Sequence, residues 1–296
     1  MIELKNNSGK NIKNNPDTLQ NGKINFIGEK CTIDASNIDY KNLNYSIRTI
    51  LSEIKFSGSN NSDKNIKTIE LNNILGQRYI GDGIQNKINI LIHGTPGNDL
   101  AAFMDGPEIE VFGNVQDGTG NTMNSGKVIV HGSAGDILGY SMRGGEIYIK
   151  QDVGYRSGIH MKSYLDKFPV IVIGGKAGHF LGEYMAGGII IILGVNSPVN
   201  LMKNFYLFDD DEIAGDYIGT GMHGGTIFVR GKINNHKLGK EIIKSKIDNE
   251  DEKILKKYID NYFGYFGLEG KEKINFSDFL KLTPFSKRPY GKLYAY

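Results

Sequence analysis

The chain has 296 residues, enough to bury a sizeable core in one large domain or two small ones. Its 35 basic and 33 acidic side chains give a net charge of +2, which excludes the basic surface typical of proteins that bind nucleic acid or anionic membranes. The single cysteine, Cys31, excludes an internal disulfide and any cysteine-ligated zinc or iron–sulfur centre. Thirty-nine glycines without a Gly-X-Y period favour a repeat fold that has glycine at its corners.

Membrane insertion is not expected. The longest apolar run, residues 186–195, is interrupted by glycine and is shorter than the ~20 residues that a spanning helix needs. The N-terminus does not resemble a signal peptide. We therefore expect a soluble, cytoplasmic protein.

The first 89 residues are predicted to form a leader and a cap. Residues 1–23 are polar and rich in asparagine, which is typical of a mobile leader or of an arm that orders on a partner. Residues 24–89 predict a small α/β cap. Within it, Asp39 is placed to cap a helix from Tyr40 to about Ile54, and residues 66–71 predict a short strand.

Residues 90–232 contain an internal repeat. Met104, Met123, Met142 and Met161 recur every nineteen residues, and Met185 and Met222 follow after longer spacings. Glycine or alanine stands three positions before each of these methionines. β-Branched residues stand five and seven positions after each of them, except after Met161, where five inserted residues move the pair to ten and twelve positions. The first column, which begins one period earlier, is Ile90, Ile109, Val128, Ile147, Ile171, Ile190 and Ile227.

This spacing predicts the architecture. Alternate side chains of a strand share a face, so seven stacked strands would place the β-branched pairs in two inward ladders. Nineteen residues are too few for a strand and a packed helix in every coil. We therefore expect a mainly β fold, a right-handed, single-stranded parallel β-helix, with the hand taken from the crossover rule for parallel strands.

Two insertions and a C-terminal segment depart from the period. The insertions, 162–169 and 196–213, are expected to form loops on one face, where solenoids frequently bind their partners. Residues 233–296 are predicted to form a helical capping segment and tail at the open end of the solenoid. A helix is expected to begin with Asn249 and Glu252 as its amino-terminal signals.

Most candidate chemistry has a structural interpretation. The glycine groups lead into strands, whereas a phosphate loop opens a helix, and the Met column suits core filling. A polar column six positions before each Met is interpreted as corner hydrogen bonding in preference to a calcium ladder. His93, His131 and His223 are isolated in sequence and are interpreted as structural. We predict no catalytic, cofactor-binding or metal-binding residue in this chain.

Partner contacts are predicted at three places. The coil 154–162 concentrates Arg156, His160 and Lys162, for which a contact surface is favoured over an active site. Tyr148 belongs to an apolar column that points out of the sheet and needs a cover, either from the chain's own ends or from another subunit. Lys287 and Arg288 lie in the aromatic and basic tail.

Several motifs together resemble a known family. These are GQRYIGDG (76–83), GDILGYSMRGG, GYRSGIHMK, GTGMHGG and TPFSKRPYG. They resemble the GXGXG domain at the carboxy-terminal end of the glutamate synthase large subunit, over about residues 24–296, and in particular the standalone form of that domain.

The resemblance implies a β-helix that packs catalytic domains together. In that family the glutaminase nucleophile and the FMN and iron–sulfur centres belong to other domains, so partner glutaminase and synthase chains are expected, and no catalytic residue carries over to this chain. Two alternatives stay open: the equivalent β-helix subunit of formylmethanofuran dehydrogenase, which shares the repeat, and a free-standing β-helix enzyme acting on polysaccharide. Self-association of this subunit is left open as well.

Overall fold

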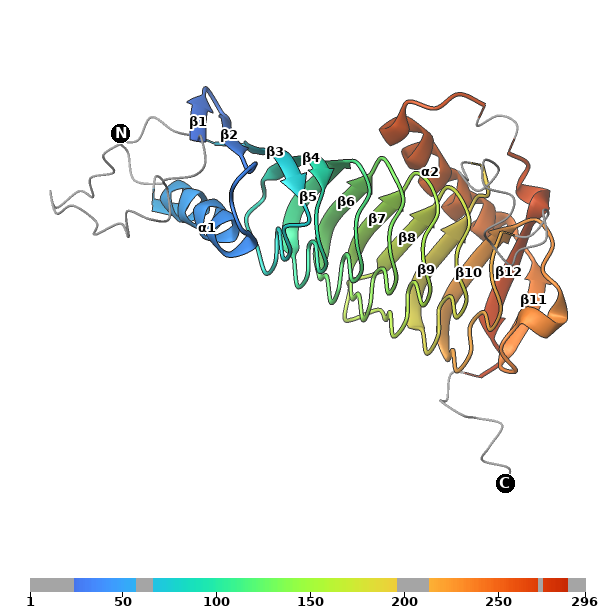
Figure 1. Ribbon diagram of the computed structural model, residues 1–296. Coiled ribbons are helices and arrows are strands. Elements are labelled where there is room, and N and C mark those ends of the chain that lie inside the picture. The colour runs from blue at the N-terminus through green and yellow to red at the C-terminus, as the bar shows by residue number, and fades with distance from the viewer. Residues whose placement is uncertain (1–23, 57–65, 196–212, 271–273, 287–296) are drawn as a thin grey trace, which may run out of the picture.

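The computed structural model is a β-solenoid and describes residues 24–56, 66–195, 213–270 and 274–286 (Figure 1). One continuous sheet runs along it, with the strands β1–β10 in chain order and then β12 and β11. The first elements are β1 (Ile24–Ile27), β2 (Lys30–Asp34), α1 (Tyr40–Phe56), β3 (Thr68–Leu75), β4 (Asn89–Thr95), β5 (Asp105–Phe112) and β6 (Ser125–Val130). The others are β7 (Gly145–Ile149), β8 (Pro169–Ile173), β9 (Ala186–Ile192), β10 (Gly224–Arg230), β11 (Ile242–Lys246), α2 (Asn249–Phe266) and β12 (Phe279–Pro284).

The N-terminal elements join the solenoid. The predicted helix is confirmed as α1, and the Asp39 carboxylate caps it by accepting the backbone N–H groups of Lys41 and Asn42 at 2.8 and 2.9 Å. Parallel pairing begins earlier than the expected start near Ile90, because β2 pairs with β3 and β3 with β4 in parallel. Only β1 is antiparallel at this end. The α/β cap is thus continuous with the first coils.

The inward ladders are confirmed. The residues from Ile90 to Ile227 that share the first β-branched column are Cα partners in successive strands, and every one is fully buried. The Met column is buried beside them, as a core-filling role requires. Outside the main sheet, Val115, Ala134, Val153, Ala177 and Ala214 form a line of single parallel bridges, so each coil carries one full strand.

Ladder isoleucines determine where glycine is needed. A Cβ on Gly120, Gly139 or Gly158 would lie only 2.4–2.6 Å from the Cδ1 atom of Ile147, Ile171 or Ile190, respectively. Ala101 occupies the equivalent turn position one coil before Val128, the ladder residue that lacks a δ carbon. The size of the turn residue is therefore matched to the size of the ladder residue above it.

The polar corner column is confirmed as well. The Asp117 Oδ1 atom accepts the Asp136 N–H at 2.8 Å, and the Asp136 Oδ1 atom accepts the Tyr155 N–H at 2.8 Å. The His179 Nδ1 atom accepts the Asp216 N–H at 2.9 Å. Each side chain bonds the next coil, which is the corner role expected for these residues.

Helix α2 covers the outer face of the sheet (Figure 1). The outward column Ile129, Tyr148, Val172, Ile191 and Phe228 packs against Leu255, Tyr258, Ile259, Tyr262 and Phe263 of the helix. Tyr148 is fully buried, and its hydroxyl donates to the Glu146 Oε2 atom at 2.7 Å and accepts from the Asn261 Nδ2 atom at 3.2 Å. The prediction that Tyr148 contacts a partner is therefore wrong: the chain's own helix covers it.

The outer edge of β10, the last parallel strand, is covered by β12. This strand pairs antiparallel with β10 and separates it from β11, so a strand, and not the expected helix, protects the edge of β10. The α2 cap also lies one residue earlier than predicted. Asp248 accepts the N–H groups of Glu250 and Asp251 at 2.9 Å, and Asp251 accepts the Asp248 N–H in return.

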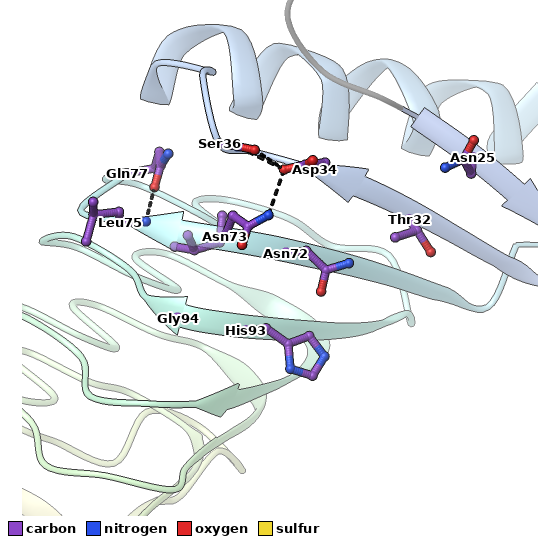
Figure 2. Close-up of a pocket in the computed structure, with 11 residues that line it drawn as sticks. Asn25, Thr32, Asp34, Ser36, Asn72, Asn73, Leu75, Gln77, His93 and Gly94 are labelled. Carbon is purple, nitrogen blue, oxygen red and sulfur yellow. Dashed lines mark hydrogen bonds between the residues drawn. The ribbon is translucent and has the colours of Figure 1, made fainter.

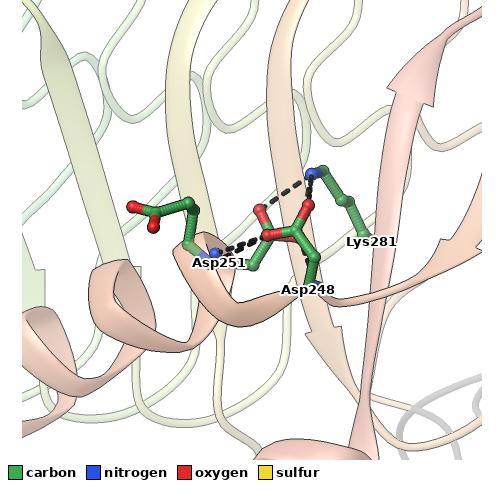
Figure 3. Close-up of polar contacts among 4 residues, drawn as sticks. Asp248, Asp251 and Lys281 are labelled. Atoms are coloured by element: carbon green, nitrogen blue, oxygen red, sulfur yellow. Dashed lines mark hydrogen bonds and ion pairs between the residues drawn. The ribbon is translucent and has the colours of Figure 1, made fainter.

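A lysine of β12 binds this cap (Figure 3). The Lys281 Nζ atom lies 2.8 Å from Asp251 and 3.6 Å from Asp248. Hydrogen bonds from the backbone of Asp251, and secondarily Lys281, hold the pKa of Asp248 below its ordinary value. Partial burial opposes the charged form of Lys281, but its two carboxylate partners outweigh that effect and raise its pKa.

Steric matching gives a prediction for Gly158. Gly158→Ala should lower the free energy of unfolding by about 2–4 kcal/mol, because the added Cβ meets Ile190 and because alanine is strained at positive φ. Ile190→Val alone should cost about 1 kcal/mol. In the double variant the steric part of the Gly158→Ala cost should disappear. Its loss in free energy of unfolding should therefore be smaller than the sum of the two single losses. Denaturant unfolding measures all three, and strict additivity would contradict the matching.

Burial of Tyr148 gives a second prediction. Tyr148→Lys should destabilise the protein by several kcal/mol and detach α2, because the ammonium would lie in an apolar layer. Leu91→Lys is the matched control, since Leu91 shares the outward column but is partly exposed between Glu70 and Glu110. Thermal unfolding and hydrogen exchange of α2 measure the effect. Equal stability of the two variants would show that α2 does not cover Tyr148.

The cap contact gives a pH dependence. Because the pKa of Asp248 is lowered on folding, its contribution is present above 3.8, its ordinary value, and is lost as the pH falls through the folded-state pKa. The contribution of Lys281, whose pKa is raised, is present below 10.5 and is lost as the pH rises above that. Lys281→Met should lower the Tm by roughly 5 °C at pH 7. That difference should shrink as the pH falls below 3.8 and through the lower folded-state pKa of Asp248. A constant difference down to acid pH would contradict the ionic contact.

Candidate functional site

The turns that precede the strands share an unusual backbone. In each coil three alternate residues have positive φ; in the coil that contains Arg156, Gly158 and His160 these angles are 55°, 72° and 55°. The Arg156 and His160 N–H groups donate to the following coil, to the oxygens of His179 and Glu183 at 2.9 Å. The Gly158 N–H donates to the preceding coil, to the Leu138 oxygen at 2.7 Å. Alternate positive φ angles thus direct the amides to both neighbours.

Only the middle position of each turn needs a small residue. It faces the ladder, whereas the two flanking positions do not, and in several coils they carry exposed side chains such as Phe103 and Tyr217. Large residues occupy many of these flanking positions despite a cost of about 1–2 kcal/mol for a left-handed L-residue. Those with an aromatic ring or a guanidinium are Tyr79, Phe103, Arg156, His160, Phe180, Tyr184 and Tyr217.

The last coils arrange these side chains in two stacks. In the first, the Arg156 guanidinium lies 4.8 Å from the Phe180 ring centroid, and the Phe180 and Tyr217 rings stack at 4.8 Å with an interplanar angle of 12°. In the second, His160 stacks on Tyr184 at 5.3 Å and 10°. We call these five residues, with their exposed neighbours Tyr140 and Tyr155, the aromatic edge. Tyr155 and Tyr217 are 50% and 55% exposed.

Arg156 is also held by an ion pair. Its Nε atom donates to the Glu183 Oε2 atom at 3.0 Å. The Glu183 side chain is only 12% exposed, while that of Arg156 is 49% exposed. The buried Glu183 carboxylate therefore orients the Arg156 guanidinium, which is still accessible to solvent.

The sequence-predicted contact residues separate into three groups. The structure brings Arg156 and His160 together on the aromatic edge, and Lys162 follows on the same coil as an exposed side chain. Tyr148 lies beneath α2. Lys287 and Arg288 lie outside the described residues, as does nearly all of the insertion at 196–213. The insertion at 162–169 is a turn closed by Tyr164 and Lys167, whose ammonium binds Asp105 at 3.1 Å.

Sequence reasoning missed the other members of the aromatic edge. Phe180 and Tyr217 stand five positions before their methionines, like Arg156, and Tyr184 stands one position before, like His160. The same frame that aligns the glycines therefore aligns these side chains. Their common left-handed backbone is what distinguishes them from other surface residues.

A second cluster lies on the outer face of the sheet, next to the C-terminal end of α2, where His131 packs edge-on against Phe266 at 5.2 Å. Phe112 stacks between His93 and His131 at 4.8 Å from each, so these histidines are not isolated as the sequence suggested. His93 binds Glu70 at 3.1 Å, and His131 binds Glu110 at 2.8 Å. Hydrogen bonds from Lys30 and His93, together with the charges of these two side chains, outweigh burial and lower the pKa of Glu70. Glu70 is therefore better suited to accept hydrogen bonds as a carboxylate than to donate a proton.

An open hollow of about 1120 Å³ adjoins this cluster (Figure 2). Most of the residues that line it have polar side chains, and among those from β1–β4 are Asn25, Thr32, Asn72 and His93. Asp34 accepts from Asn73 at 2.9 Å, and Gln77 accepts the Leu75 N–H at 2.6 Å. Within the described ranges, no three His, Cys, Asp or Glu residues gather as metal ligands would, and no helix is long and apolar enough to cross a membrane.

Comparisons with known proteins identify the repeat. The model of the GXGXG motif matches residues 41–285. An uncharacterized protein of Methanocaldococcus jannaschii is 50% identical over 270 residues, which cover 90% of this chain and 97% of that protein. A chain in the crystal structure of the formyltransferase/hydrolase complex of Methylorubrum extorquens, solved with methylofuran, has a similar fold. The TM-score is 0.51 with 17% identity, covering 87% of this chain and 91% of that one. The chain belongs to the GXGXG motif family.

Proposed function

We propose that this chain is a non-catalytic scaffold subunit of a multi-protein enzyme complex. The observation that carries the proposal is how the solenoid uses its surfaces. The apolar part of the sheet is already covered by α2, and the histidines and carboxylates beside it are paired with one another. Large aromatic side chains are instead held on an exposed edge. This arrangement suits contact with another protein better than it suits a reaction in an enclosed site.

One candidate assembly is of the formyltransferase/hydrolase type. The similar solved chain is part of such a complex, and the match covers 87% of this chain and 91% of that one. This assembly corresponds to the first alternative left open by the sequence, the β-helix subunit of a formylmethanofuran dehydrogenase-like complex. It has the stronger support from comparison with solved structures, although that similarity concerns the fold.

The second candidate is a glutamate synthase complex. It is favoured by the sequence motifs, among them GYRSGIHMK and TPFSKRPYG, that resemble the standalone GXGXG domain of that enzyme. In this assembly the chain would pack a glutaminase chain against a synthase chain. Glutamine hydrolysis, FMN and the iron–sulfur cluster would belong to those partners, and no cofactor would be held by this chain.

Reconstitution distinguishes the assemblies. The full-length chain would be mixed with purified glutaminase and synthase chains from one organism. In a separate mixture it would be combined with the formyltransferase/hydrolase subunits of the same organism. Size-exclusion chromatography with light scattering measures whether a complex forms. We expect a stoichiometric complex with one set and greater activity of that set when the chain is present. Elution of the chain alone from both mixtures would contradict the scaffold proposal; a larger mass without partners would show self-association.

A further inference from the structure

We propose that the aromatic edge is the surface on which the chain docks a partner subunit, and that this partner presents an apolar patch bordered by carboxylates. The proposal rests on the scaffold function and specifies where it is carried out. The aromatic edge comprises Arg156, Phe180, Tyr217, His160 and Tyr184, with Tyr140 and Tyr155 beside them.

Backbone strain is the first argument. Gly118 and Gly221 show that glycine fits the flanking turn positions, and it adopts their positive φ without strain. His160 and Tyr217 instead hold φ at 55° and 64°. These side chains project outward, and the solenoid core does not need them. Strained residues whose side chains the fold does not require are typical of functional surfaces.

The composition of the edge is the second argument. Tyr, Phe, His and Arg gather there, and Tyr and Arg are among the residues that dominate binding energy in protein interfaces. Tyr217 and Tyr155 are about half exposed, although a ring of that size is stabilised by burial. Exposed aromatic rings that gather on one edge generally indicate a surface that a partner covers. On the sheet, α2 provides it, whereas no described segment of this chain packs over the exposed rings of Tyr155 and Tyr217.

The stacks also prepare the edge for binding. Phe180 and Tyr217 pack nearly parallel, and His160 and Tyr184 do the same. Neighbours of this kind restrict the rotamers before a partner arrives. Binding then loses less side-chain entropy than it would on an unordered surface.

Charge specifies the partner's chemistry. The coil 154–162 carries three exposed basic side chains, Arg156, His160 and Lys162, and no carboxylate. Glu183 binds Arg156 from the buried side, which leaves the outer side of the guanidinium available. A partner with carboxylates around its apolar patch would complement this coil in charge and in shape.

Glycine substitutions test the edge, because they remove the side chain and relieve the backbone. His160→Gly and Tyr217→Gly should each weaken the affinity for the partner by at least about tenfold, with a Tm no lower than that of the wild type. Tyr217→Phe should keep the affinity. Phe103→Gly is the matched control, since Phe103 has φ 55°, is 54% exposed and holds the same turn position as His160 in an earlier coil. The probe is whichever purified set, the glutaminase and synthase chains or the formyltransferase/hydrolase subunits, binds the wild-type chain.

The outcomes are distinguishable. If the wild-type chain binds neither set, the scaffold function fails before any variant is compared, and this assignment fails with it. If the wild type binds but both glycine variants bind within about twofold of it, only the edge is wrong. A Tm loss that parallels the affinity loss would mean that the stacks serve the fold. Loss of self-association without loss of partner binding would assign the edge to a second copy of this chain.

Discussion

The structure depends on a steric match between the left-handed turns and the inward ladders. Each middle turn position lies against a ladder side chain of a later strand, and the ladder isoleucines leave no room there for a Cβ. Alanine appears in the repeat at Ala101, where the corresponding ladder residue, Val128, is one carbon smaller. Because each coil fits its successors in this way, the period of the repeat, the parallel register and the buried Met column are determined together. The described insertion lies in the loop closed by Tyr164 and Lys167, and the β7–β8 register stays intact across it.

The same turns separate the residues that the fold requires from those that it does not. Alternating positive φ angles direct the amides of Arg156 and His160 to one neighbouring coil and that of Gly158 to the other, so the hydrogen bonding is complete whatever side chain stands at the flanking positions. The fold therefore constrains the middle residue and leaves the flanking ones free to change. Large aromatic residues at these free positions reduce stability through their backbone conformation, which is why we attribute them to binding.

Much of the fold could be predicted because the relevant signals are local and periodic. Ladder burial, parallel register and the Asp117–Asp136 corner bonds all follow from a fixed spacing in sequence. The cover over Tyr148 could not be predicted: its partner, Asn261, is more than a hundred positions away, and an outward apolar column looks the same whether a helix or another chain covers it. The left-handed side chains were missed for a different reason. A glycine in the sequence indicates a possible positive φ, whereas a phenylalanine or tyrosine such as Phe180 or Tyr217 does not. Only their spacing from the methionine column relates these two residues to Arg156.

Covering the sheet with α2 has a consequence for where partners can bind. The helix spans the outward column from Ile129 to Phe228, and its N-terminal cap is fixed to β12 by Lys281, so the apolar side of the late coils is occupied from within the chain. Antiparallel strands likewise protect the edge of β10. The exposed rings of the aromatic edge remain on these coils, and none of its residues belongs to the cluster that packs under α2. A solenoid arranged in this way keeps its fold independent of its partner, since the residues that complete its core and those that we assign to docking are different residues on different faces.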